Sequence, residues 1–166
     1  MGKIAILYGS SGGNTEMVAK SIQALFEGEA DLFNVESVRF DDFKDYKYLI
    51  LGTSTTGIGD LQDDWDGFLP SFAKSNLADK KVAIFALGDS ASYSSSFAES
   101  MRVIYDAIEG KTTIVGSVED EGYIYDDSMG VIDGTWLGLP IDEDYEDDQT
   151  DARIEAWVED LKKEFV

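Results

Sequence analysis

The residues best suited to bind a ligand form a short loop between an apolar run at 4–8 and a helical pattern that begins near Thr15. The loop is rich in Ser and Gly, and no Lys or Arg lies between Lys3 and Lys20. Free backbone N–H groups, hydroxyls and the positive end of a helix dipole can together bind a phosphate without a cationic side chain. The candidate phosphate ligands are Ser10, Ser11, Gly12, Gly13, Asn14 and Thr15.

The spacing of the glycines argues against a pyrophosphate. Neither G-x-G-x-x-G nor G-x-x-x-x-G-K-[ST] can be read through Gly9, Gly12 and Gly13, so the loop favours a phosphomonoester. On the loop alone, a Gly/Ser turn that only joins the strand to the helix is an equally good interpretation.

Length, composition and charge limit the functions that this chain can have. The 166 residues are 43% apolar, which is enough for one core, so we expect a single domain over 1–166. The formal net charge of −21 argues against nucleic acid or an anionic membrane surface and favours basic partners. The chain has no Cys and no His, which excludes thiol, disulfide and imidazole chemistry. Without a signal-peptide pattern or a run of membrane-spanning length, a cytoplasmic protein is expected.

Apolar runs alternate with segments of helical periodicity along the chain. This alternation predicts right-handed βαβ units and a doubly wound parallel sheet with helices on both faces. Residues 117–135 interrupt the rhythm, and we interpret them as an insertion that splits the fifth strand. The predicted strands are 4–8, 31–38, 48–52, 81–87 and 112–116, the last resuming at 136–141, and the predicted helices are 14–28, 61–72, 97–108 and 154–165.

Three of the predicted strands end in loops of small residues. In a doubly wound sheet, ligands bind outside the carboxyl ends of the strands, so these loops should converge there. The loops begin at Gly9, Gly52 and Gly88.

The loops resemble those of flavodoxins, and the split last strand resembles the long-chain branch of that family. The first loop is similar to T/S-x-T/S-G-x-T, although Gly12 stands where a hydroxyl residue is usual. The segment 59–62 reads Gly-Asp-Leu-Gln, matching the family pattern G-[DE]-L-Q, and Tyr93 falls where the family has a stacking Tyr. Thr56 occupies the place of a second stacking residue, usually Trp. The flavin contacts that the resemblance implies are Ser54, Thr55, Thr56, Gly57, Ile58 and Gly59 in one loop and Leu87, Gly88, Asp89, Tyr93, Ser96 and Phe97 in the other.

The resemblance implies a flavodoxin-like α/β fold, with a five-stranded parallel sheet in the order 2-1-3-4-5 and non-covalently bound FMN. It further implies a monomeric, low-potential, one-electron carrier rather than an enzyme. Its partners would be redox proteins with basic docking surfaces: reductase-type donors and oxidoreductase acceptors. At position 57, Gly would let the neighbouring peptide reorient toward the flavin at little steric cost.

Two rival functions differ in their site chemistry. A phosphoreceiver domain shares the architecture but needs acidic residues after the first and third strands, where this chain has Gly9-Ser10 and Gly52-Thr53. An FMN-dependent quinone or azo reductase remains the alternative, because Thr56 clears the usual Trp position and the fold tolerates new sites.

A base-free acidic segment runs from Thr112 to Ala152. It does not meet the D-x-[DN]-x-[DN]-G spacing of a calcium loop, so we expect no metal there. A solvated face is the simplest interpretation, and a surface that steers basic partners is the functional one. Its 13 carboxylates are Glu119, Asp120, Glu121, Asp126, Asp127, Asp133, Asp142, Glu143, Asp144, Glu146, Asp147, Asp148 and Asp151.

Overall fold

A parallel β-sheet forms the centre of the protein in a computed structural model that describes residues 3–166. The predicted strand order is confirmed, because β2, β1, β3 and β5 are parallel neighbours in that sequence. Two short strands, β6 and β10, share the fifth position, and both pair in parallel with β5. The strands are β1 (Ile4–Tyr8), β2 (Ala30–Asn34), β3 (Tyr48–Thr56), β5 (Lys81–Leu87), β6 (Thr113–Ile114) and β10 (Leu139–Ile141).

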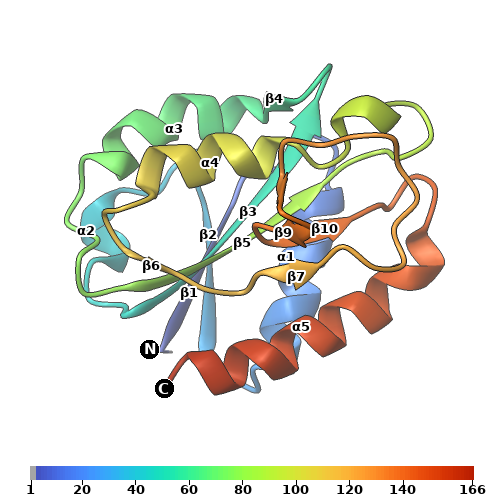
Figure 1. The fold of residues 1–166 in the computed structure, drawn as a ribbon. Coiled ribbons are helices and arrows are strands. Elements are labelled where there is room, and N and C mark those ends of the chain that lie inside the picture. The colour runs from blue at the N-terminus through green and yellow to red at the C-terminus, as the bar shows by residue number, and fades with distance from the viewer. Residues whose placement is uncertain (1–2) are drawn as a thin grey trace.

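The sheet buries a separate apolar core on each face, as its near-continuous apolar strands require. Alternation along β1 divides the side chains, so that Ala5 and Leu7 join one core while Ile4 and Ile6 join the other. Figure 1 shows α3 and α4 covering one face and α1 and α5 the other. These helices are α1 (Asn14–Leu25), α3 (Asp63–Ala73), α4 (Ser100–Ile108) and α5 (Thr150–Glu164).

The element boundaries differ from the sequence prediction where short local pairings intervene. Leu61 was predicted at the start of a helix but belongs to β4 (Asp60–Leu61), which pairs antiparallel with the end of β3. Phe97 was likewise predicted in a helix but lies between the 3₁₀ turn η1 (Ser94–Ser96) and α4. The four-residue α2 (Phe40–Phe43) was not predicted, since one turn has no measurable period.

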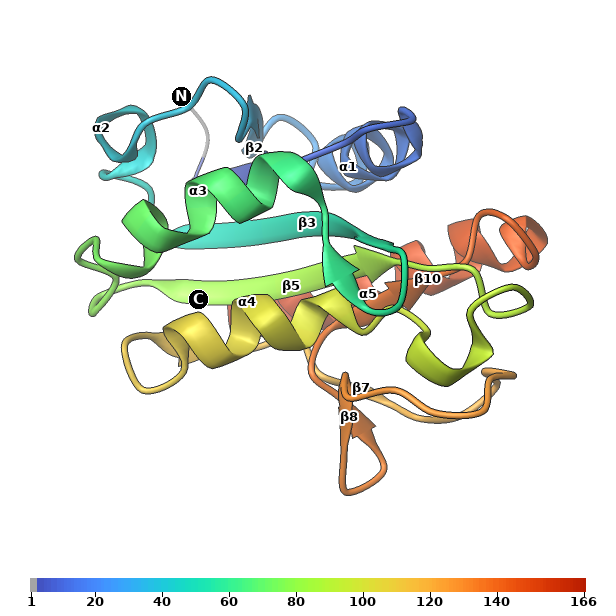
Figure 2. The ribbon, with the colours of Figure 1, turned by 90° about the horizontal axis from the view of Figure 1, so that it is seen from above.

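The segment that we interpret as an insertion, with Trp136 after it, folds into a small antiparallel sheet of its own. Its strands β7 (Val118–Glu119), β9 (Thr135–Trp136) and β8 (Val131–Ile132) are adjacent in that order. Figure 2 shows this sheet at the margin of the molecule, beyond α4 and β10. The buried Trp136 ring anchors it, donating from Nε1 to Asp120 Oδ1 at 3.0 Å.

The acidic segment leads into α5 through a second 3₁₀ turn, η2 (Asp147–Gln149). None of the helices in residues 3–166 is long and apolar enough to cross a membrane. The predicted domain, 1–166, includes Met1 and Gly2, which lie outside the described residues.

Candidate functional site

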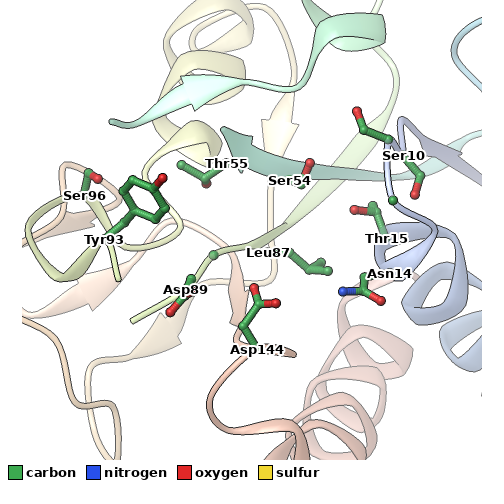
Figure 3. Close-up of a pocket in the computed structure, with 13 residues that line it drawn as sticks. Ser10, Asn14, Thr15, Ser54, Thr55, Leu87, Asp89, Tyr93, Ser96 and Asp144 are labelled. Atoms are coloured by element: carbon green, nitrogen blue, oxygen red, sulfur yellow. The ribbon is translucent and has the colours of Figure 1, made fainter. Parts of the chain in front are cut away.

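A cleft of about 210 Å³ opens at the carboxyl ends of β1, β3 and β5, where the three small-residue loops were expected to meet. Figure 3 shows Ser10, Asn14 and Thr15 at one end of the cleft and Tyr93 at the other, with Leu87 and Asp144 between them. The lining residues are Ser10, Ser11, Gly12, Asn14, Thr15, Ser54, Thr55, Leu87, Gly88, Asp89, Tyr93, Ser96 and Asp144.

One end of the cleft is a cradle of backbone and hydroxyl donors. Gly13 caps the start of α1 with a φ of 94°, a conformation that glycine adopts without strain, and it supplies no side-chain cap. The first-turn N–H groups of a helix have no intrahelical acceptor, so they remain available to an anion. The Ser10 Oγ atom closes the loop by accepting from the Gly13 N–H at 3.0 Å, and Thr15 is 2% exposed in the first turn.

The opposite end of the cleft is formed by the loop after β5. Asp89 shapes this loop, because its carboxylate accepts from the N–H groups of Ala91 and Ser92 and its carbonyl accepts from the Tyr93 N–H. Gly88 permits close packing, since a Cβ there would lie 2.5 Å from the Ala98 nitrogen. The loop leaves Tyr93 46% exposed at the cleft.

The middle of the cleft is acidic. Asp144 lines it, and desolvation together with the charges of Asp89 and Asp142 raises the pKa of its carboxyl group. Asp142 is fully buried and accepts from the backbone N–H and the hydroxyl of Ser90. This contact fastens the segment that carries Asp144 to the loop that carries Asp89.

The loop after β3 forms a tight hairpin at the rim of the cleft. Thr55 enters the cleft, and its hydroxyl lies 2.7 Å from that of Ser100. Gly57 and Gly59 have φ angles of 52° and 82°, so the turn between β3 and β4 depends on residues without a Cβ. Ile58, at the tip, is 81% exposed.

Most of the predicted site residues come together, but six do not line the cleft. Gly13 is the exposed N-cap of α1, and the hairpin residues sit at the rim. Phe97 is buried in the core, where its ring packs against Tyr125 and Trp136. The six are Gly13, Thr56, Gly57, Ile58, Gly59 and Phe97. The prediction omitted Asp144, because one acid within an acidic run carries no distinguishing signal.

The insertion contacts the loops that border the cleft. The backbone N–H groups of Asp126 and Asp127 donate to the Ser94 carbonyl at 2.9 and 3.0 Å. The Glu99 Oε1 atom accepts from the Met129 N–H at 2.8 Å, while its Oε2 atom fills the space that a Cβ on Gly59 would need. Residues 126–129 therefore hold the loop after β5, and Glu99 of that loop lies in turn against Gly59 of the turn between β3 and β4.

A doubly wound sheet with its cleft at the carboxyl ends of the strands, beside the helix that follows β1, defines an α/β protein of the switch-point type. Residues 6–157 match the family model described as flavodoxin. The chain is 40% identical to a flavodoxin of Helicobacter pylori over 166 residues, covering 99% of each chain. It is 39% identical to flavodoxin 1 of Azotobacter vinelandii over 172 residues, covering 100% of this chain and 99% of that one. The chain belongs to the flavodoxin family.

A solved structure agrees with this family assignment. The crystal structure of Fusobacterium nucleatum flavodoxin bound to flavin mononucleotide superimposes with a TM-score of 0.91, at 26% sequence identity, covering 97% of both chains. Within residues 3–166, no group of three or more acidic side chains is arranged to hold a metal ion.

Proposed function

We propose that this protein binds FMN non-covalently and carries single electrons at low potential between redox proteins. The observation that carries the proposal is the cleft itself: a phosphate cradle at one end and an exposed tyrosine ring at the other. When bound, FMN supplies the redox chemistry, because its isoalloxazine ring accepts and releases electrons one at a time.

The residues present fit FMN piece by piece. The hydroxyls of Ser10, Ser11 and Thr15 and the free N–H groups of the first turn of α1 would hold the phosphate. The carboxylates of Asp89 and Asp144 would accept hydrogen bonds from the ribityl hydroxyls. A volume of about 210 Å³ is below the range of pockets that enclose a whole drug-sized ligand, so the ring should lie at the rim.

The rim residues would bind the isoalloxazine ring. Tyr93 offers it an aromatic face, and the 54–59 loop borders it from β3, with Gly57 able to present its peptide in more than one orientation. Phe97 would not contact the flavin itself but would support Gly88 of the loop after β5, because its Cδ1 atom lies 3.0 Å from the position of a Cβ on Gly88.

The acids around the cleft support a low reduction potential. Adding an electron beside Asp89, Asp144 and the buried Asp142 is opposed by their negative charge, which acts strongly in a partly desolvated site. For a one-electron couple, each tenfold change in the relative stability of the two states is worth about 59 mV.

The acidic segment also suggests the partners. Its first acids lie in the segment that we interpret as an insertion, which contacts the loop after β5 at Ser94 and Glu99, and its later acids include Asp144 of the cleft. The negative charge therefore adjoins the cleft in which we place the flavin. We propose that it steers a monomeric, cytoplasmic, single-domain protein toward basic surfaces on reductase-type donors and oxidoreductase acceptors.

An absorption spectrum of the purified protein tests whether it carries a flavin. Anaerobic titration with a one-electron reductant then tests whether that flavin takes up electrons one at a time. A bound flavin that is released on denaturation and identified as FMN, with two resolved one-electron steps, is the expected result. Protein that neither carries FMN nor takes it up would refute the proposal.

The quinone or azo reductase alternative has one observation in its favour. Thr56 has no ring, and its hydroxyl is directed back into the hairpin toward the carbonyls of Asp60 and Leu61 at 3.4 Å. That face of a bound flavin could admit a second substrate. Steady-state oxidation of NADPH with a quinone by the isolated FMN-loaded protein would support the enzyme, and turnover no faster than free FMN would support the carrier.

A further inference from the structure

Gln62 is a buried polar residue that lies against the phosphate cradle. It precedes α3 as the N-cap and is 1% exposed. The contact with the first loop is so close that a Cβ on Gly9 would stand 2.2 Å from the Gln62 Oε1 atom. A buried amide must satisfy both its oxygen and its nitrogen, so its partners define what it does.

The orientation of the Gln62 amide is fixed by partners whose roles cannot be exchanged. Its Oε1 atom faces the backbone N–H of Trp65 at 3.2 Å, and a backbone N–H can only donate. Its Nε2 atom lies 2.9 Å from an Asp64 carboxylate oxygen, which can only accept when ionised. The reverse orientation would place two donors together and two acceptors together.

This orientation determines the direction of the Ser11 hydroxyl. The second Nε2 proton is donated to Ser11 Oγ at 3.1 Å, so that oxygen acts as the acceptor and its own proton must point elsewhere. Ser11 is exposed and lines the cleft, whereas Gly12 and Gly13 bring no hydroxyl to the same stretch. The hydroxyl proton is thereby free to be directed at an anion in the cradle.

We propose that Gln62 is a positioning residue that sets Ser11 as a hydrogen-bond donor to the phosphate of FMN. The inference rests on the proposed function, since it assigns the ligand of the cradle to the FMN phosphate. Gln62 does not touch the ligand. It lowers the cost of binding by orienting the hydroxyl before the phosphate arrives, which is preorganisation.

A double-mutant cycle tests the coupling. Dissociation constants for FMN and for riboflavin, which has no phosphate, are measured by flavin fluorescence on the apoprotein of the parent, Ser11→Ala, Gln62→Met and the double variant. Ser11→Ala should weaken FMN about 10- to 100-fold, the loss expected for a hydrogen bond to a charged acceptor. Gln62→Met should weaken FMN several-fold, with riboflavin unchanged, and should have almost no effect once Ser11 is Ala.

Two further variants guard the interpretation. Ser10→Ala is the matched hydroxyl control, because Ser10 is fixed by Gly13 rather than by Gln62, so Gln62→Met should cost as much in that background as in the parent. Gln62→Glu keeps an acceptor for the Trp65 N–H if the Met variant does not fold. It should turn the Ser11 proton away from the ligand, so the FMN loss should be larger with the Ser11 hydroxyl present than in the Ser11→Ala background, where only repulsion between the new carboxylate and the phosphate is left.

The outcomes separate this inference from the function on which it rests. Equal losses of FMN and riboflavin in Gln62→Met, or the same FMN loss with and without the Ser11 hydroxyl, would overturn the positioning role while leaving FMN binding intact. A parent protein that binds no FMN would overturn the proposed function before the cycle begins.

Discussion

Replacing Tyr93 with Ala should remove most of the energy that holds the isoalloxazine ring. Tyr93 is 46% exposed, which for an aromatic residue of roughly 200 Å² leaves about 90 Å² for the flavin to cover. At about 25 cal/mol per Å² this burial is worth roughly 2.3 kcal/mol, and a stacked pair adds about 0.5–1.5 kcal/mol. Allowing for the contact that Ala keeps, we expect a loss of about 3 kcal/mol, on the order of 100-fold in the dissociation constant.

Fluorescence titration of the apoprotein with FMN and riboflavin measures this loss directly. Tyr93→Ala should weaken both ligands alike, because the ring is common to them, and should restore flavin fluorescence that stacking quenches. Tyr93→Phe should retain most of the affinity. The matched control is Tyr145→Ala, since Tyr145 is 63% exposed but does not line the cleft.

The stacking role of Tyr93 would be refuted if Tyr93→Ala bound riboflavin with unchanged affinity and the flavin fluorescence were still quenched. The stacking residue would then have been misidentified, and the assignment of the loop after β5 to the flavin ring would fail. Loss of FMN binding with riboflavin retained would contradict the placement in another way, by putting Tyr93 at the phosphate end.

Three other perturbations probe separate parts of the molecule. Thr15→Ala should weaken FMN by about 1.5–3 kcal/mol and leave riboflavin nearly unchanged, so equal losses in the same titration would remove Thr15 from the phosphate cradle. The rate of electron transfer to a basic partner, measured by stopped flow, should fall steeply as the Debye length decreases from about 10 Å at 0.1 M salt to about 3 Å at 1 M. A rate that does not change with salt would mean that the acidic residues serve solubility and do not steer the partner. Burial, and then the 2.5 Å hydrogen bond to Asp31, raise the pKa of Tyr46 from 10.0 to about 12. Its contribution to stability should be complete below pH 10 and be lost as the pH rises through 12, so urea unfolding of Tyr46→Phe should show a shallower alkaline decline than the parent.

The sequence predicted the sheet well because its strands are buried on both faces. The run 81–87 coincides with β5, since a short apolar run that ends at a glycine-containing loop is typical of a strand buried on both faces. The hairpin of β3 and β4 was missed because Thr55–Thr56 and Asp60–Leu61 pair over only two residues each. Such short strand pairs are stabilised by the surrounding fold rather than by local propensity, so no sequence pattern predicts them.

The candidate site was predicted from loops that follow strands, and this explains which of its residues line the cleft and why Asp144 was not among them. Residues such as Ser54 and Leu87 reach the cleft because they end neighbouring parallel strands, a consequence of topology alone. Phe97 was carried over from a family pattern, but burial against Trp136 places it in the core. Asp144 reaches the cleft through contacts that join residues far apart in the chain, which no local signal encodes.

Those long-range contacts show that the acidic segment has two separable physical roles. Asp142 is fully buried, and its carboxylate is stabilised by the Ser90 N–H and hydroxyl and by the Tyr145 N–H at 2.9 Å. Without that carboxylate, the Ser90 donors would lose their acceptor and the segment carrying Asp144 would lose its tie to the loop carrying Asp89. Asp148, in contrast, is exposed and adds only to the long-range field. Within this run, buried Asp142 therefore holds the cleft together, while exposed acids outside the cleft, such as Asp148, act on a partner that approaches from solution.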